Sequence, residues 1–154
     1  MDRVIIRAML ASDYDKVYAL WQTISGFGLR SIDDSREGVE KFIKRNPTTS
    51  VVAVCGDEIV GSVLCGHDGR TGYFYHVCVK KEMRRKGIGK EMVVRAMRQL
   101  SEEGINKVSL LAFRDNKGGN AFWHQVGWKE REDINFYDFV LNAENITAFN
   151  SGEE

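Results

Sequence analysis

A basic turn between a strand-like run and a helical pattern places the strongest limit on what this chain can fold into. Residues Tyr73–Val79 are mainly aromatic and β-branched, which is typical of a strand. The turn that follows, Lys80–Lys90, is rich in lysine and arginine and contains Gly87 and Gly89. From Ile88 to about Glu103 apolar residues recur at helical spacing. A strand, a turn and a helix in this order predict an α/β protein.

The rest of the chain shows the same mixture of patterns. Strands are predicted at residues 3–8, 50–55, 59–65, 73–79, 107–113 and 134–141, and the second and third of these form a hairpin. Helices are predicted at residues 14–24, after the Asp33-Asp34-Ser35 cap until Asn46-Pro47, at 88–103 and at 119–126. The order β-α-α-β-β-β-α-β-α-β predicts an α/β sandwich with a mixed sheet.

Length and charge narrow the class of protein further. A chain of 154 residues favours one domain, which we place at residues 1–144, with residues 145–154 as a polar, frayed tail. Such a domain buries about 70% of its unfolded surface, so it needs no disulfide or metal to fold. Lysine plus arginine and aspartate plus glutamate both number 22, so the balanced charge provides no general attraction to nucleic acid.

No part of the sequence predicts membrane insertion or export. The chain has no apolar run close to the roughly 20 residues that span a bilayer. The N-terminal apolar stretch is too short for a signal peptide. We therefore expect no membrane partner and a cytoplasmic protein.

Cysteine and histidine spacing gives no sign of a metal centre. Cys55, Cys65 and Cys78 lie in apolar β-like runs, which favours buried structural thiols over a disulfide framework or a catalytic thiol. The three histidines form no pair at zinc-binding spacing with one another or with cysteine. No metal is expected.

The basic turn has the chemistry that a pyrophosphate needs. Glycine at positions 87 and 89 lets backbone N–H groups approach an anion closely. The start of the following helix adds roughly half a positive charge. The turn matches neither the Walker loop nor the dinucleotide fingerprint. A solvated basic turn and a nucleic-acid patch are the alternatives, but the flanking strands lack a basic-aromatic alternation.

Two motifs resemble the GNAT superfamily of N-acetyltransferases. The Arg84-x-x-Gly87-x-Gly89 turn looks like that family's acetyl-CoA motif. The segment from Asn116 to Trp128 resembles the family's N-x-x-A-x-x-[FL]-Y-x-x-x-G-F pattern. The Gly66–Arg70 loop before the Y-x-Y-H strand is similar to one group of small bacterial members. The resemblance covers nearly the whole chain, up to Leu141.

The resemblance implies a fold and a co-substrate. The fold is a mixed central sheet of six to seven strands, with helices on both faces and a splayed pair of parallel strands that holds acetyl-CoA. Here that pair is 73–79 with 107–113. The implied acetyl-CoA residues are Val77, Cys78, Val79, Arg84, Arg85, Lys86, Gly87, Ile88, Gly89, Lys90, Asn116, Gly119, Asn120, Phe122 and Trp123. The strand backbone pairs with pantetheine, and the turn holds the pyrophosphate.

One position departs from the family pattern. Many similar proteins have tyrosine where this chain has Trp123, and its hydroxyl protonates the departing CoA thiolate. An indole N–H donates a hydrogen bond but is not a useful acid. A thiol with a pKa of about 8.5 leaves unprotonated at pH 7 for about 2 kcal/mol, so activity is compatible with this change. We expect Trp123 to act as a packing surface.

The general base is predicted only as a group of candidates. His67, Asp68, Tyr73 and His76 lie near the expected acetyl position. Tyrosine, with a pKa near 10, is a poor base at pH 7, and each histidine could instead be a structural, hydrogen-bonded one. By alternation, Tyr73, Tyr75, Val77 and Val79 share one face of the strand, and Phe74, His76 and Cys78 share the other. Asp33 and Asp34 are either helix caps or groups that attract an ammonium.

The resemblance implies acetyl transfer from acetyl-CoA to a primary amine of a small molecule or peptide, by direct attack. The alternative hypothesis is a binding module that senses acyl-CoA with little catalysis. Trp123 supports this alternative, because it replaces the tyrosine that acts as the acid in many similar proteins. A third hypothesis is association with RNA through the basic turn. The expected partners are acetyl-CoA and an amine, with no nucleic acid, and the chain is a monomer or a homodimer.

Overall fold

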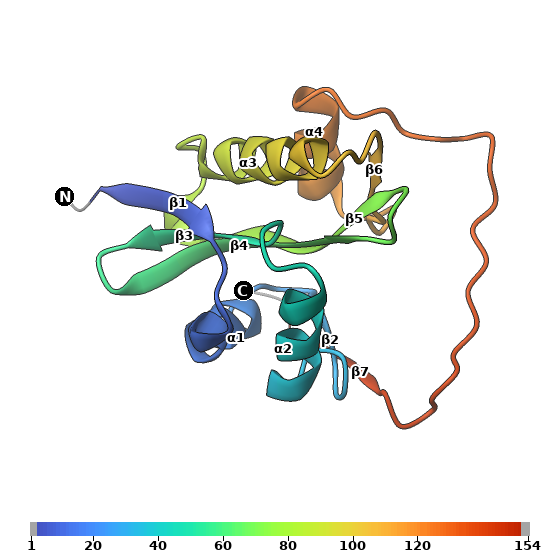
Figure 1. Ribbon diagram of the computed structural model, residues 1–154, viewed down its shortest axis with the longest axis horizontal. Helices are drawn as coiled ribbons and strands as arrows, with labels where there is room; N and C mark the ends of the chain where they lie inside the picture. The colour runs from blue at the N-terminus through green and yellow to red at the C-terminus, as the bar shows by residue number, and fades with distance from the viewer. Residues whose placement is uncertain (1–2, 152–154) are drawn as a thin grey trace.

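The computed structural model describes residues 3–151, in which helices cover both faces of a central sheet (Figure 1). The elements in order are β1 (Val4–Ala8), η1 (Ala11–Asp13), α1 (Tyr14–Gln22), β2 (Gly28–Arg30), α2 (Arg36–Arg45), β3 (Val51–Cys55), β4 (Glu58–His67), β5 (Gly72–Val79), η2 (Lys81–Met83), α3 (Ile88–Glu102), β6 (Val108–Ser109), α4 (Lys117–Gln125) and β7 (Thr147–Phe149).

The central sheet is mixed, as predicted, but contains five strands. Their spatial order is β1-β3-β4-β5-β6, with antiparallel neighbours except for the parallel pair β5 and β6. The strands β2 and β7 form a separate two-stranded sheet. The expected count of six to seven is therefore too high for the central sheet, because the segment 134–141 does not join it.

Two apolar layers hold the sheet between its helices. On one face, α1 and α2 bury a cluster that includes Trp21, Val39 and Leu64. On the other face, α3 buries Met92 and Leu100 against a second cluster of sheet residues, and α4 packs at its margin. Because both faces are covered, β4 is buried over most of its length, as a central strand must be.

Helix boundaries follow the capping signals in the sequence. Ser35 caps α2, and its side chain accepts a hydrogen bond from the amide of Gly38 at 3.1 Å. Gly104 has a φ of +81° just after α3, as expected for a glycine that ends a helix. Asp13 precedes α1, but its carboxylate binds Arg7 and the amide of Leu10 instead of capping the helix.

A bulge in β5 interrupts the alternation of side-chain direction that we expected along this strand, so that expectation is wrong. Ser62 pairs with Cys78 and Leu64 pairs with Tyr75, so β5 has one residue more than β4 between these pairs. His76 lies within this bulge with a φ of +48°. The extra residue reverses the side-chain direction, so Phe74 packs in the α3 layer whereas Cys78 packs in the α1 layer.

The end of the chain differs from both expectations for it. Residues 134–141 form no strand and extend away from the body in a long arm (Figure 1). A strand needs an edge to pair with, and β6 ends after two residues. The tail that we expected to fray contains β7, which pairs with β2. The side chain of Asn150 holds this end by donating to the carbonyl of Trp21 at 2.7 Å.

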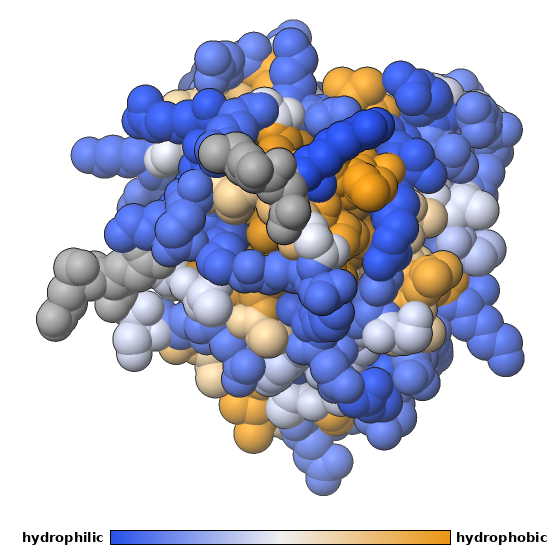
Figure 2. Space-filling view, turned by 90° about the vertical axis from the view of Figure 1, so that its left-hand side faces the viewer, coloured by the Kyte–Doolittle hydropathy of each residue, from blue (hydrophilic) through white to orange (hydrophobic). Residues whose placement is uncertain are grey.

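The end of the sheet that carries β1 is mostly hydrophilic, with an apolar patch near the middle of the view (Figure 2). Within residues 3–151, none of the helices has the length and apolarity needed to cross a membrane. Cys65 and Cys78 are buried, and burial raises the pKa of each thiol to about 12. Both thiols are therefore structural, as predicted.

Candidate functional site

The parallel strands β5 and β6 separate soon after they meet. They pair only at Gly72 with Val108 and at Tyr73 with Ser109, and the amide of Gly72 donates to the carbonyl of Lys107 at 2.8 Å. From Phe74 to Val79 the same edge of β5 has no paired strand among the described residues. A ligand that contains amide groups could pair with this edge in the way that an added strand does.

The basic turn lies at the end of the open edge of β5. Arg84, Arg85, Lys86 and Lys90 are exposed. Gly87 has a φ of +80° and precedes α3 without any side-chain cap, so the first N–H groups of α3 are available to an anion. Arg85 has a φ of +65°. The turn therefore offers an anion both formal charge and uncapped backbone donors.

Arg84 fixes the turn to the strand that precedes it. Its Nε donates to the carbonyl of Val79 at 2.9 Å. This hydrogen bond closes the turn back onto the end of β5. The first arginine of the motif thus shapes the anion cradle in addition to contributing charge.

Gly89 allows α4 to approach the start of α3. A Cβ atom at position 89 would lie 3.3 Å from the ring of Phe122 and 3.6 Å from the side chain of Val79. Ile88, one residue earlier, is buried in the α3 layer. Phe122 therefore forms an apolar wall beside the donors of the turn.

Three residues of the second motif build the start of α4. The side chain of Asn116 accepts from the amide of Gly119 at 3.0 Å. A Cβ at position 119 would lie 2.5 Å from Asn116 Nδ2, so a larger residue there would displace the side chain that forms this cap. Asn120 Nδ2 donates to the carbonyls of Phe113 and Asn116, each at 2.9 Å. These hydrogen bonds hold the connection from β6 to α4.

Trp123 packs among aromatic rings of the protein. Its ring centroid lies 4.8 Å from that of Trp128, 5.0 Å from Phe122 and 6.2 Å from Phe74. Offset and tilted pairs at such distances stabilise a core beyond the area that they bury. Trp123 therefore contributes to packing within the protein, and its contact with the pantetheine arm stays a prediction.

His76 is held by a buried carboxylate and two aromatic rings. Its Nε2 lies 2.8 Å from Asp34 Oδ1, and the two side chains are 12% and 6% exposed. The imidazole centroid lies 4.7 Å from Trp21 and 5.2 Å from Phe27. Because Asp34 accepts from Nε2–H, the neutral ring has Nδ1 as its acceptor.

Asp34 is itself fixed from two sides. Its Oδ2 accepts from the amide of Arg30 at 2.7 Å, and its carbonyl accepts from the hydroxyl of Tyr14 at 2.6 Å. Desolvation raises the pKa of this tyrosine to about 12, so it stays protonated as a donor. Sequence reasoning left Asp34 between two roles and did not pair it with His76.

The other candidate bases lie elsewhere. His67 is paired across the sheet with Gly72, at the closed end of the β5–β6 splay. Its Nε2 lies 2.9 Å from Glu103 Oε1, and its Nδ1 accepts from the amide of Gly69. Tyr73 lies 5.0 Å from Tyr75, and burial raises its pKa further above the neutral range. His67 therefore lies outside the bulge, and the ring beside Tyr73 is that of a second tyrosine.

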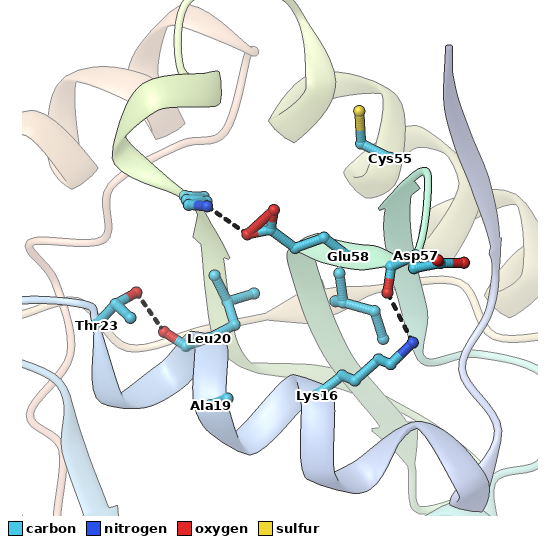
Figure 3. A pocket seen from close by; sticks show the side chains of 9 residues that line it. Lys16, Ala19, Leu20, Thr23, Cys55, Asp57 and Glu58 are labelled. Atoms are coloured by element: carbon cyan, nitrogen blue, oxygen red, sulfur yellow. Dashed lines mark hydrogen bonds and ion pairs between the residues drawn. The ribbon is translucent and has the colours of Figure 1, made fainter. Parts of the chain in front are cut away.

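A hollow on the α1 face of the sheet has a volume of about 520 Å³ (Figure 3). It lies between α1 and the turn that joins β3 to β4. Lys16 Nζ donates to the carbonyl of Asp57 at 2.7 Å, and Lys80 pairs with Glu58. Both lysines at its rim thus have partners, one a backbone carbonyl and the other a carboxylate, and we do not assign the catalytic site to this hollow.

Comparison with known proteins agrees with this geometry. The profile of the acetyltransferase (GNAT) family matches residues 14–128. An acetyltransferase of Pectobacterium atrosepticum, ECA0875, is 32% identical over 111 residues, which cover 72% of this chain and 77% of that protein. The chain therefore belongs to the GNAT family and is an acetyl-CoA-dependent acetyltransferase.

Solved structures show the same fold at low sequence identity. The PaiA N-acetyltransferase of Thermoplasma acidophilum, in complex with coenzyme A, is 16% identical with a TM-score of 0.71, over 94% of this chain and 96% of that one. Diaminobutyrate acetyltransferase EctA of Paenibacillus lautus, in complex with L-2,4-diaminobutyric acid and coenzyme A, is 20% identical with a TM-score of 0.68, over 81% and 75%.

Proposed function

We propose that this acetyltransferase transfers the acetyl group to a primary amine of a small molecule or peptide by direct attack. The observation that carries the proposal is the open edge of β5, which leads from the bulge at His76 to the uncapped start of α3. One continuous edge thus links a base, an unpaired backbone and an anion cradle.

Acetyl-CoA is proposed to lie along this edge with its pyrophosphate at the basic turn and its thioester at the bulge. The backbone of Val77–Val79 pairs with the pantetheine amides, and the turn from Arg84 to Lys90 binds the pyrophosphate. Phe122 packs against the methylenes of the arm. This placement puts the thioester near the bulge, at the narrow end of the splay.

His76 is the proposed base. The amine nitrogen attacks the acetyl carbon, a C–N bond forms, and the C–S bond breaks to release CoA as a thiolate. The proton of the amine passes to His76 Nδ1, directly or through one water. Asp34 holds the Nε2–H tautomer and stabilises the imidazolium that forms. A backbone N–H of Cys78 or Val79 stabilises the negative charge on the carbonyl oxygen.

The acceptor enters on the α1–α2 side of the sheet. His76 lies on this side between Trp21 and Phe27, and Tyr75 lies 5.9 Å from Phe42. Aromatic walls beside a buried carboxylate suit an amine that carries apolar groups. The EctA complex supports an amine acceptor for this fold, since that enzyme binds a diamino acid.

Trp123 favours a second candidate, an acyl-CoA sensor without turnover. Its indole replaces the phenol that many similar proteins use as an acid, and it is packed on Trp128 and Phe74. A sensor would bind acetyl-CoA on the same edge but would not release CoA when amines are added.

Steady-state thiol release with a panel of amines separates the two functions. The panel covers polyamines, amino acids, aminoglycosides and peptide N-termini, and mass spectrometry identifies any acetylated product. We expect amine-dependent release of CoA with at least one class. Saturable binding of acetyl-CoA without release for any amine would contradict the transfer reaction and support the sensor.

A further inference from the structure

The end of β2 places a cation beside the carboxylate that holds the proposed base, His76. The amide of Arg30 donates to Asp34 Oδ2 at 2.7 Å, and the amide of Asp34 donates to the carbonyl of Arg30 at 3.0 Å. The other oxygen of the same carboxylate lies 2.8 Å from His76 Nε2. The backbone of Arg30 is therefore fixed to the group that holds His76, and β2 lies on the same side of the sheet as α1 and α2 (Figure 1).

The bulge in β5 turns both Tyr75 and His76 to this side of the sheet. The ring of Tyr75 lies 5.9 Å from that of Phe42 in α2, and the ring of His76 lies 4.7 Å from that of Trp21 in α1. In a regular strand, neighbouring side chains point to opposite faces. Because of the bulge, an imidazole and a phenol lie next to each other on one face, and Tyr75 is 42% exposed.

The charge of Arg30 acts on the hydroxyl of Tyr75. Burial raises the pKa of Tyr75, and the positive charge of Arg30 opposes that rise. The hydroxyl is therefore protonated at neutral pH and can donate a hydrogen bond. Within residues 3–151, neither the Arg30 guanidinium nor the Tyr75 hydroxyl has a hydrogen bond or an ion pair. The charge of Asp33 also acts on Tyr75, but Asp33 Oδ2 accepts from Asn145 at 2.8 Å.

We propose that the acetyl acceptor is an amino acid, whose carboxylate binds the Arg30 guanidinium and the Tyr75 hydroxyl while its amine lies at His76. This inference rests on the proposed function, because it places the acceptor amine at His76. A guanidinium binds a carboxylate through two parallel N–H donors, and the phenol provides a third donor. Since Tyr75 and His76 are adjacent, the two subsites suit an amine and a carboxylate that are separated by only a few bonds.

The carboxylate contact is expected to affect binding of the acceptor and not the chemical step. Arg30 lies outside the reacting atoms, so it stabilises the ground state and the transition state equally. Arg30→Gln should raise the KM for the acceptor about tenfold to a hundredfold, as expected for loss of a hydrogen bond to a charged group, and leave kcat nearly unchanged. The side chain is exposed, so the melting temperature should not change.

Amino acids and their amides test the proposal as matched pairs. L-leucine, L-phenylalanine, L-threonine and L-lysine are each compared with the corresponding amide by steady-state CoA release. The wild type should prefer the acid in at least one pair, by about tenfold or more in kcat/KM, and Arg30→Gln should abolish that preference. The amine of an amide loses its proton more easily than that of the acid, so amine basicity alone would favour the amide. Equal or better turnover of every amide by the wild type would overturn the proposal.

Three further variants separate charge, geometry and general effects of substitution. Arg30→Lys keeps the charge but loses the paired donors, so it should retain part of the preference. Arg30→Glu should reverse the preference in favour of the amide. Arg98→Gln, at an exposed position of α3 on the other side of the sheet, is the matched control and should behave as the wild type. An equal effect of Arg30→Gln and Arg98→Gln would contradict the role of Arg30.

Calorimetry separates this proposal from the transfer reaction itself. The wild type and Arg30→Gln, each saturated with CoA, are titrated with the same acids and amides, so that binding is measured without turnover. Binding of an acid that is lost in Arg30→Gln supports the carboxylate subsite whether or not any amine is acetylated. If no amine is acetylated, only the proposed transfer fails. Acetylation of amines without preference for an acid, and without tighter binding of it, would keep the transfer and overturn the carboxylate subsite.

Discussion

His76 shows how a single residue takes a position that its neighbours in sequence do not predict. The extra residue of the β5 bulge turns its ring toward α1 and α2, where Asp34 and two aromatic rings hold it. Outside glycine, only His76 and Arg85 have positive φ among the residues described, and both belong to the proposed site. Strained backbone of this kind is concentrated at functional sites.

Replacing His76 tests the proposed base directly. His76→Ala should lower kcat by about a hundredfold or more, which is the usual contribution of a positioned base, while acetyl-CoA binding stays unchanged. Added imidazole should restore part of the rate, because the variant leaves a space between Trp21 and Phe27. His67→Gln is the matched control and should keep near-normal kcat. Equal losses in the two variants, without rescue, would rule out this assignment.

Trp123 should act through its ring surface. Trp123→Phe keeps most of the aromatic packing and should change kcat little. Trp123→Ala removes the contacts with Phe74 and Trp128, so it should lower stability by about 3 kcal/mol and raise the KM for acetyl-CoA. Trp123→Tyr restores a phenol and raises kcat if thiolate departure limits the rate.

The measurements are kcat, KM and the unfolding free energy of the three variants. A hundredfold loss of kcat in Trp123→Phe, with the fold intact, would mean that the indole N–H contacts the transition state.

At the scale of elements, local patterns predicted most of the helices and the central strands. The hairpin expected at 50–55 and 59–65 is observed as Val51–Cys55 and Glu58–His67, and α3 ends one residue before the predicted Glu103. These elements are specified by apolar periodicity and caps within a short stretch of chain. The basic turn could also be predicted, because its chemistry is contained in consecutive residues.

Features that depend on distant parts of the chain could not be predicted. The bulge at His76 leaves no local signal, since it arises from the pairing of β5 with β4. The same is true of β7, which pairs with β2 more than a hundred residues earlier. The segment 134–141 has the residue pattern of a strand, but such a segment forms a strand only where the edge of a sheet is available for backbone hydrogen bonds.

A branched side chain at position 89 should prevent the turn before α3 from binding acetyl-CoA. Gly89→Val should abolish the rise in melting temperature that acetyl-CoA causes, because the branched side chain occupies the space needed by the phosphates and presses on Phe122. The contact with Phe122 should lower the melting temperature without ligand, so the rise caused by acetyl-CoA is measured from each variant's own ligand-free value. Gly118→Ala, with open space at its Cβ position, is the control and should respond to acetyl-CoA as the wild type does. An unchanged response in Gly89→Val would refute the phosphate role of this turn.

At the scale of the whole molecule, one ion pair couples stability to pH. The carboxylate of Asp13 binds both terminal nitrogens of Arg7 at 2.8 Å and the amide of Leu10 at 2.8 Å. The hydrogen bonds from Arg7 lower the pKa of Asp13 in the folded state. A lowered pKa means that this stabilisation is complete above the unfolded value of about 3.9 and is lost as pH falls through the folded pKa.

Asp13→Asn is therefore expected to destabilise the fold by about 1–2 kcal/mol at pH 7. The difference from the wild type should shrink as pH falls below the unfolded value of about 3.9 and through the lower pKa of the folded state. Urea unfolding at several pH values measures it. Asp133→Asn, in an exposed pair with Arg131 on the arm, is the control and should leave stability unchanged. A difference that stays constant down to pH 2 would contradict the assignment to this carboxylate.

Hydrogen–deuterium exchange with and without acetyl-CoA tests most directly whether the ligand lies along β5 and the basic turn. We predict slower exchange in peptides that cover residues 74–91, because the ligand pairs with the strand edge and with the uncapped amides of α3. The control is β1, at the opposite edge of the sheet, which should exchange at the same rate in both states. Protection confined to the α1 hollow of Figure 3, with none in residues 74–91, would contradict the account.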